Sequence, residues 1–167
     1  MNGTTSGILT AKAPILLMEL SAADPRLVVL VLYAAAVSLK IFGVVAVLTR
    51  VNGSREQSIQ FHGAGAQVSP HEIRPTRAAD LRTRGLLDDA QAQAWEDEIN
   101  TYVEYSAPGS RRRYNPALYE TQAKMVERGR DPNLPPVVPH LHLQVPPWTS
   151  RASDPIVRLW TIGAGSV

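Results

Sequence analysis

A run of apolar residues at positions 27–48, LVVLVLYAAAVSLKIFGVVAVL, constrains this chain more than any other feature. As a helix that rises about 1.5 Å per residue, the run would measure roughly 30 Å, the hydrocarbon thickness of a bilayer. Asp24 is a suitable N-cap just before the run, and Pro25 suits the first helical position. The sequence therefore predicts a single transmembrane helix within residues 24–50, with a buried core helix as the alternative.

Lys40 is the one charged residue inside this run. An ammonium group deep in hydrocarbon costs on the order of 3 kcal/mol, so the side chain either extends toward the membrane surface or meets a polar group of a neighbouring subunit. Ala36 and Gly43 fall on the same helix face as Lys40, and their small size permits close approach of another helix. We expect these three residues to contact a partner or lipid.

Four segments are predicted outside the span. Residues 1–23 contain the short apolar cluster ILLM and are expected to form an interfacial or partner-bound segment. Residues 51–75 are polar and glycine-containing, which is typical of a linker. Residues 76–130 are expected to form short helices, and residues 131–167 a proline-rich extended arm with an apolar tail. The predicted fold class is therefore mainly α, with a single transmembrane helix and no independent large globular core.

Capping residues place three helices within the helical segment. The first is predicted over residues 76–85, the second over 88–105 and the third over 115–129. Asp88 caps the second helix, and Gln91 occupies the capping-box position. One apolar stripe on the second helix consists of Trp95, Ile99, Tyr102 and Val103. Such a narrow stripe could pack within a small helical hairpin or lie on another protein.

Six prolines between positions 131 and 148 exclude a helix there and favour an extended chain. Such an arm is either a flexible spacer or a segment that docks on a neighbouring protein. Its rigid, extended backbone would lose little entropy on docking. The residues expected to make the contacts of the arm and tail are Leu134, Val138, Leu141, Trp148 and Trp160.

The charge balance argues against a nucleic-acid partner. The chain has 17 basic and 15 acidic residues, and no basic field extends over any long segment. The local run Arg111, Arg112 and Arg113 is expected to contact acidic lipid headgroups or an acidic neighbour. The absence of cysteine removes disulfides and thiolate chemistry from consideration.

Histidines give the clearest candidates for chemistry. His140 and His142 stand two apart in an extended segment, so both project to one side and offer two metal ligands. A third ligand is not evident near them in the sequence, and His62 and His71 fall in a predicted loop or helix start. The acidic residues 96–98 spiral around a predicted helix and do not converge. The sequence therefore predicts no metal, no cofactor and no catalytic residue.

The segment VLYAAAVSLKIFGVVAVLTRVN, residues 31–52, resembles the first transmembrane helix of the membrane-associated glutathione and eicosanoid enzymes. Those enzymes often carry a lysine late in that helix and a basic residue at its exit. The resemblance implies a four-helix membrane bundle that binds glutathione at trimer interfaces. The family then carries an Asn-Pro-Glu-Asp type of motif, where this chain has NGSRE at residues 52–56.

Two functions follow from these patterns. The first is a non-catalytic accessory subunit of a large membrane complex, such as a respiratory-chain or ATP synthase assembly of the mitochondrial inner membrane. Its partners would be other subunits and lipids. The alternative is a membrane-bound enzyme related to the glutathione and eicosanoid family. Comigration with a large complex on a native gel would support the first function, and glutathione binding by a small homo-oligomer the second.

Overall fold

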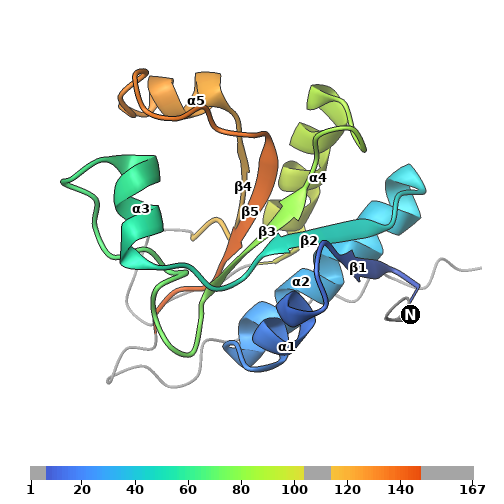
Figure 1. Cartoon of the computed structure of the whole chain (residues 1–167). Helices are drawn as coiled ribbons and strands as arrows, with labels where there is room; N and C mark the ends of the chain where they lie inside the picture. The colour runs from blue at the N-terminus through green and yellow to red at the C-terminus, as the bar shows by residue number, and fades with distance from the viewer. Residues whose placement is uncertain (1–6, 104–113, 148–167) are drawn as a thin grey trace, which may run out of the picture.

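A mixed sheet of five strands forms the centre of the structure, a computed structural model that describes residues 7–103 and 114–147 (Figure 1). The strands are β1 (Leu9–Ala11), β2 (Ala46–Arg50), β3 (Ala78–Arg82), β4 (Ala117–Glu120) and β5 (His140–Gln144). They lie in the order β1-β2-β3-β5-β4. β1 runs parallel to β2, and the other neighbouring strands pair antiparallel.

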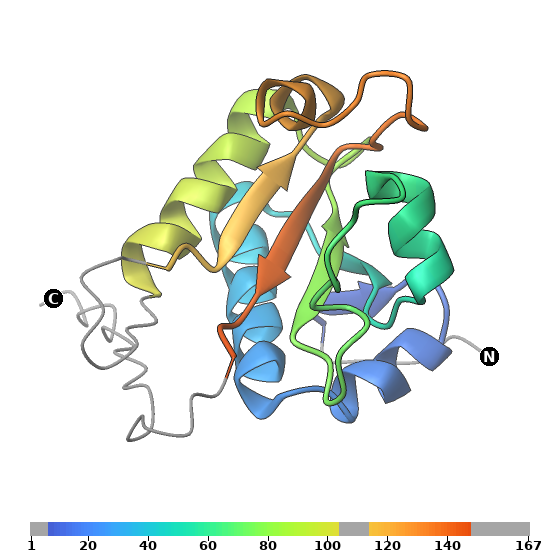
Figure 2. The same ribbon diagram turned by 90° about the vertical axis from the view of Figure 1, so that its left-hand side faces the viewer.

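Helices lie on both sides of this sheet. They are α1 (Ile15–Ser21), α2 (Pro25–Val37), the π-helical segment η1 (Ser38–Phe42), α3 (Arg55–His62), α4 (Asp89–Tyr102) and α5 (Gln122–Glu127). Figures 1 and 2 show α2 and α4 against one face of the sheet, and α3 in front of the opposite face. The sheet therefore has a face covered by α2 and α4, and a second face that is partly screened by α3.

Alternating side chains of the central strands build the core against α2 and α4. Leu81 of β3 pairs with Leu141 of β5, and both side chains are fully buried. Trp95 of α4 is buried between these layers, and its indole N–H donates to the backbone carbonyl of Ala34 at 2.9 Å. This α/β core contradicts the predicted mainly α fold without a globular core, and also the four-helix bundle that the resemblance implies.

The apolar run begins as predicted but does not continue as one helix. Asp24 caps α2 by accepting from the backbone N–H of Arg26 at 3.0 Å, and Pro25 is the first helical residue. The helix ends before Gly43, which has a left-handed φ of 68°. The residues that follow are rich in valine and form β2, because β-branched side chains favour a pleated strand.

One helix in the described part of the chain, Pro25–Phe42, has the length and composition to cross a membrane. Within the structure, 44% of that stretch is buried. Its fully buried side chains face the sheet, whereas Val29 and Leu32 are exposed on the outer side. A core helix of a soluble protein has the same length and composition, so this feature is compatible with either location.

The helix predictions for residues 76–130 are confirmed in one case. α4 begins after Asp88 with the expected capping box, in which the Gln91 N–H donates to the Asp88 carboxylate at 2.8 Å. The prediction of a helix over 76–85 is wrong, because these residues contain β3. The prediction over 115–129 is wrong in its first half, which forms β4 before α5 begins. The predicted linker contains α3, which was missed.

The proline-rich segment supplies a central strand rather than an arm. β5 pairs with β3 on one side and β4 on the other. The prolines lie before and after the strand, so they remove none of its ladder hydrogen bonds. The exclusion of a helix in this segment was correct, but its leucines contact the core of the same chain. Leu141 is 0% exposed and contributes to that core.

Candidate metal centre

Three strands present polar side chains to the sheet face that lies away from α2 and α4. Alternation along a strand sends neighbouring side chains to opposite faces, so the leucines of β5 enter the core and its histidines face the other way. In register, Asp80 of β3 lies opposite His142 of β5, and Glu120 of β4 lies opposite His140. Four ionisable side chains are thereby gathered on one face of the sheet.

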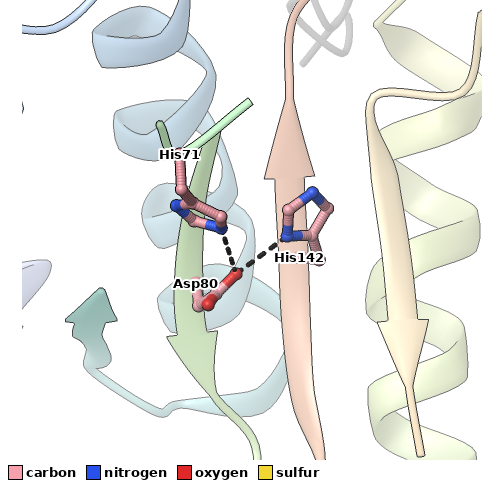
Figure 3. A group of neighbouring side chains, drawn as sticks. All are labelled: His71, Asp80 and His142. Atoms are coloured by element: carbon pink, nitrogen blue, oxygen red, sulfur yellow. Dashed lines mark hydrogen bonds and ion pairs between the residues drawn. The ribbon is translucent and has the colours of Figure 1, made fainter. Parts of the chain in front are cut away.

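A loop between α3 and β3 adds His71 to this group. Its backbone carbonyl accepts from the N–H of Gly53 at 3.0 Å, and its ring Nδ1 lies 2.6 Å from the backbone carbonyl oxygen of Val51. These contacts tie the loop to the chain that leaves β2. The His71 side chain is 3% exposed and points at the sheet (Figure 3).

Asp80 lies at the centre of the cluster, between the two histidines (Figure 3). Its Oδ1 is 2.8 Å from Nδ1 of His142 and 3.3 Å from Nε2 of His71. One ligand atom from each of the three residues lies within 4.8 Å of the other two. Asp80 is 6% exposed, so the carboxylate is held away from bulk water and depends on these partners.

The hydrogen bonding of His71 indicates that a proton or a metal ion lies between its ring and the Asp80 carboxylate. A carbonyl oxygen only accepts, so Nδ1 of His71 carries the proton donated to Val51. In the neutral ring, the lone pair of Nε2 would then face the Asp80 carboxylate oxygen at 3.3 Å, and two acceptors would oppose each other. Either a proton or a metal ion between them removes this conflict. A backbone carbonyl holding the second ring nitrogen is also the usual support of a metal-bound histidine.

Burial alone would raise the pKa of the Asp80 carboxyl. The charge of His71 and hydrogen bonds from His142 and His71 nevertheless hold that pKa well below its ordinary value. For His142, burial lowers the pKa, but the hydrogen bond to Asp80 and its charge outweigh burial and raise it. In the absence of a metal ion, the surroundings therefore favour the ionised form of Asp80 and the protonated form of His142.

A second pair of ionisable groups lies directly beside the cluster. His140 Nε2 is 3.4 Å from the Glu120 carboxylate and 3.7 Å from Asp80 Oδ1. Burial lowers the pKa of His140, but the hydrogen bond with Glu120 and the charge of Asp80 raise it to about 9. The pair can accept and release protons next to the central carboxylate.

Two imidazoles and one carboxylate form a donor set that suits zinc. Catalytic zinc sites use three protein ligands of this kind and keep a fourth position open for water or substrate. His71, Asp80 and His142 supply those three donors from a loop and two adjacent strands, and nitrogen and oxygen ligands of this type bind Zn²⁺ at about 2.0–2.2 Å. The ligand types, their convergence and the support of His71 therefore match a zinc centre.

The sequence prediction found part of this cluster. His140 and His142 do project to the same side, as expected. Only His142 belongs to the candidate ligand set, whereas His140 lies beside it and pairs with Glu120. Asp80 was missed because a helix was predicted over 76–85, and His71 because it lies in a loop that the sequence did not connect to the sheet. The alternation in HLHLQ, residues 140–144, and in AADLR, residues 78–82, was the available signal.

The residues predicted to contact partners or lipid lie apart from the metal cluster. Lys40, Ala36 and Gly43 are exposed along the second half of the apolar helix and at its end. Leu134 is half-buried and Val138 is exposed, whereas Leu141 is in the core. The other predicted contact residues lie outside the described part of the chain: Arg111, Arg112, Arg113, Trp148 and Trp160.

Comparisons with known proteins leave the cluster as the main guide to function. Neither a family model, nor a curated protein, nor a solved structure matches this chain. The donor geometry of His71, Asp80 and His142 is therefore the basis for a proposed function.

Proposed function

We propose that this protein is a zinc-dependent hydrolase whose metal ligands are His71, Asp80 and His142. The observation that carries the proposal is the convergence of both histidines on one oxygen of a buried aspartate, at 3.3 and 2.8 Å. The hydrogen bond to Val51 fixes a proton on Nδ1 of His71, the ring nitrogen away from Asp80. This arrangement supports a role for His71 as a metal ligand rather than as a simple hydrogen-bond donor. A purely structural zinc site would need a fourth protein ligand to close it.

Bound zinc would supply a Lewis acid and a water of lowered pKa at its open position. The residues beside the ligands suit the proton transfers that hydrolysis requires. His140 and Glu120, 3.4 Å apart, provide a base that takes a proton from the attacking water and an acid that returns one to the leaving group. Water is thus divided between the two products, and the protein returns to its starting protonation state.

The role as an accessory membrane subunit stays a prediction, as does a location in the mitochondrial inner membrane. Exposed apolar side chains on the outer side of the helix, among them Val29, Leu32 and Ile41, favour contact with lipid or a partner. Such contact is compatible with a hydrolase, because the metal cluster lies on the opposite face of the sheet (Figures 1 and 3).

Hydrolysis of a panel of amide, ester and phosphate-ester substrates tests the proposal. Activity should require zinc, disappear with a chelator and return when zinc is restored. Glu120→Gln should keep the zinc but reduce the rate by about 10²–10⁴-fold, the usual contribution of a positioned proton-transfer group. Lys124→Gln, which removes a charge of α5 that pairs with Glu96 at 3.7 Å, serves as the matched control and should retain the rate. Equal rates in the chelated and zinc-loaded protein would contradict a metal-dependent reaction.

A further inference from the structure

We propose that Arg50 is an oxyanion-binding residue of the metal centre, which selects ligands that carry a carboxylate or phosphate group close to the metal-bound group. The inference rests on the proposed zinc site and adds the chemical class of its ligand. It is carried by the position of Arg50 beside a metal ligand, by the space that Gly53 leaves for its guanidinium, and by the absence of a hydrogen bond or ion pair from that guanidinium to any described residue.

The strand register places Arg50 next to the cluster. Arg50 is the last residue of β2 and lies opposite Asp80 on β3, after a register shift between Leu48 and Arg50. Directly opposed residues of antiparallel strands have Cβ atoms about 4.5–5.5 Å apart, so the arginine begins beside the central carboxylate. A register shift at this point changes the direction of the Arg50 side chain from the one that regular alternation along β2 would give.

Gly53 shows where the guanidinium of Arg50 lies. A Cβ atom added to Gly53 would stand 2.5 Å from Nη2 of Arg50 and 3.1 Å from Cβ of His71. The guanidinium therefore rests on the bare backbone of Gly53, at the side of the ligand His71. A side chain at position 53 would displace the guanidinium, which can shift because it is the end of a flexible side chain, so the glycine matters here for the place of Arg50 rather than for its own backbone angles.

The guanidinium of Arg50 has no direct contact with a carboxylate in the part of the chain that the structure describes. Glu72 lies within range of its charge: hydrogen bonds from Ser58 and Ser69 lower the pKa of Glu72, and the charges of Arg55 and Arg50 lower it further. No hydrogen bond or ion pair joins its guanidinium to any residue in 7–103 or 114–147, and the side chain is half-buried. A half-buried arginine whose guanidinium donates to no carboxylate is suited to bind one from a ligand, because its planar fork matches carboxylate and phosphate oxygens.

Neighbouring arginines add positive charge near Arg50 and donate to neutral backbone carbonyls. Arg74 donates to the backbone carbonyl of His71 at 2.8 Å, and Arg130 donates to that of Phe61 at 3.0 Å, so both charges meet neutral groups there. Burial lowers the pKa of His62; the charge of Glu120 opposes this shift, and the charges of Arg130 and Arg50 add to it. Arg50 and Arg130 therefore both contribute positive charge near His62, on the helix beside the cluster.

Three small hydroxamates test this inference on the cobalt-substituted protein, whose visible absorption reports ligand binding at the metal. Acetohydroxamate offers only the metal-binding group, whereas succinate monohydroxamate adds a carboxylate and phosphonoacetohydroxamate adds a phosphonate. The wild-type protein should bind at least one anionic probe about ten- to a hundred-fold more tightly than acetohydroxamate, the factor typical of charge-assisted hydrogen bonds. The probe with the larger gain identifies the preferred anion.

Arg50→Gln should abolish this preference and leave the affinity for acetohydroxamate unchanged. Gly53→Ala should reduce the preference through displacement of the guanidinium, and serves as the second variant if Arg50→Gln is poorly folded. Arg128→Gln, which removes an exposed positive charge on another part of the chain, should behave as wild type. Equal affinities for all three probes in the wild-type protein, or a preference that survives in Arg50→Gln, would overturn the assignment. Failure to take up cobalt would instead overturn the metal centre, and this inference with it.

Discussion

Replacement of Leu141 by alanine tests whether the proline-rich segment belongs to the core of this chain. Leu141 lies in β5, between β3 and β4, and its side chain is 0% exposed. Truncation of a fully buried leucine to alanine typically costs 2–5 kcal/mol, so we expect a loss of about 3 kcal/mol in the free energy of unfolding. For a chain of 167 residues, this corresponds to a fall in Tm of roughly 6–12 °C.

Val138→Ala is the matched control, because Val138 lies in the same segment but is 56% exposed. Its substitution should change the free energy of unfolding by less than about 0.5 kcal/mol. Urea unfolding followed by circular dichroism and by tryptophan fluorescence gives both values, since Trp95 is buried in the same core. Equal stabilities for the two variants would refute the central position of β5 and restore the partner-bound arm that the sequence suggested.

Three further predictions concern other parts of the molecule. Asp88→Ala should lower the free energy of unfolding by about 1 kcal/mol through loss of the α4 capping box, measured by thermal denaturation; an unchanged Tm would contradict the cap. In the metal-free protein the pKa of His140 is raised from 6.5 to about 9, so its pairing stabilises the fold fully below about pH 6.5 and this contribution should be lost as the pH rises through 9. Urea titrations at pH 6 and pH 9.5 check this, and a smaller loss in His140→Gln is expected. Leu32→Glu should weaken cosedimentation with anionic vesicles if the exposed side of α2 contacts lipid, and equal cosedimentation would exclude that contact.

The sequence predicted correctly those features of the fold that depend on interactions between residues close together in the chain. The caps at Asp24 and Asp88 were found because a side chain that accepts from a nearby backbone N–H is encoded within four residues. The strands were missed because their stability comes from pairing between residues far apart in sequence, such as Leu81 with Leu141. Short strands with alternating small, polar and leucine residues carry a faint signal until the sheet is assembled.

The apolar run was predicted as one continuous helix for a related reason, although its last residues form β2. Hydropathy over residues 27–48 does not distinguish a membrane helix from a buried helix followed by a buried strand, because both environments select apolar side chains. Gly43 is the residue at which the two explanations differ, since its left-handed conformation ends the helix before β2. From the sequence, Gly43 was predicted instead to lie within the helix and to allow close approach of another helix.

The candidate site could be predicted only in part, because its ligands come from three separate places in the chain. The spacing of His140 and His142 correctly predicted that both lie on one side of an extended segment. Asp80 joins them through the β3–β5 register, and His71 through a loop tied to Val51. Neither connection is encoded by local spacing, so a search for ligands nearby in sequence could not complete the set.

The zinc content of the purified protein tests the central claim most directly. After equilibrium dialysis, the wild-type protein and His62→Ala, a control histidine on the adjacent helix α3, should each hold one zinc ion per chain. His71→Ala and His142→Ala should lose at least about 100-fold in zinc affinity, because removal of a ligand costs more than removal of a residue that supports one. Wild-type protein that holds no zinc, or ligand variants that bind zinc as tightly as His62→Ala, would contradict the metal centre.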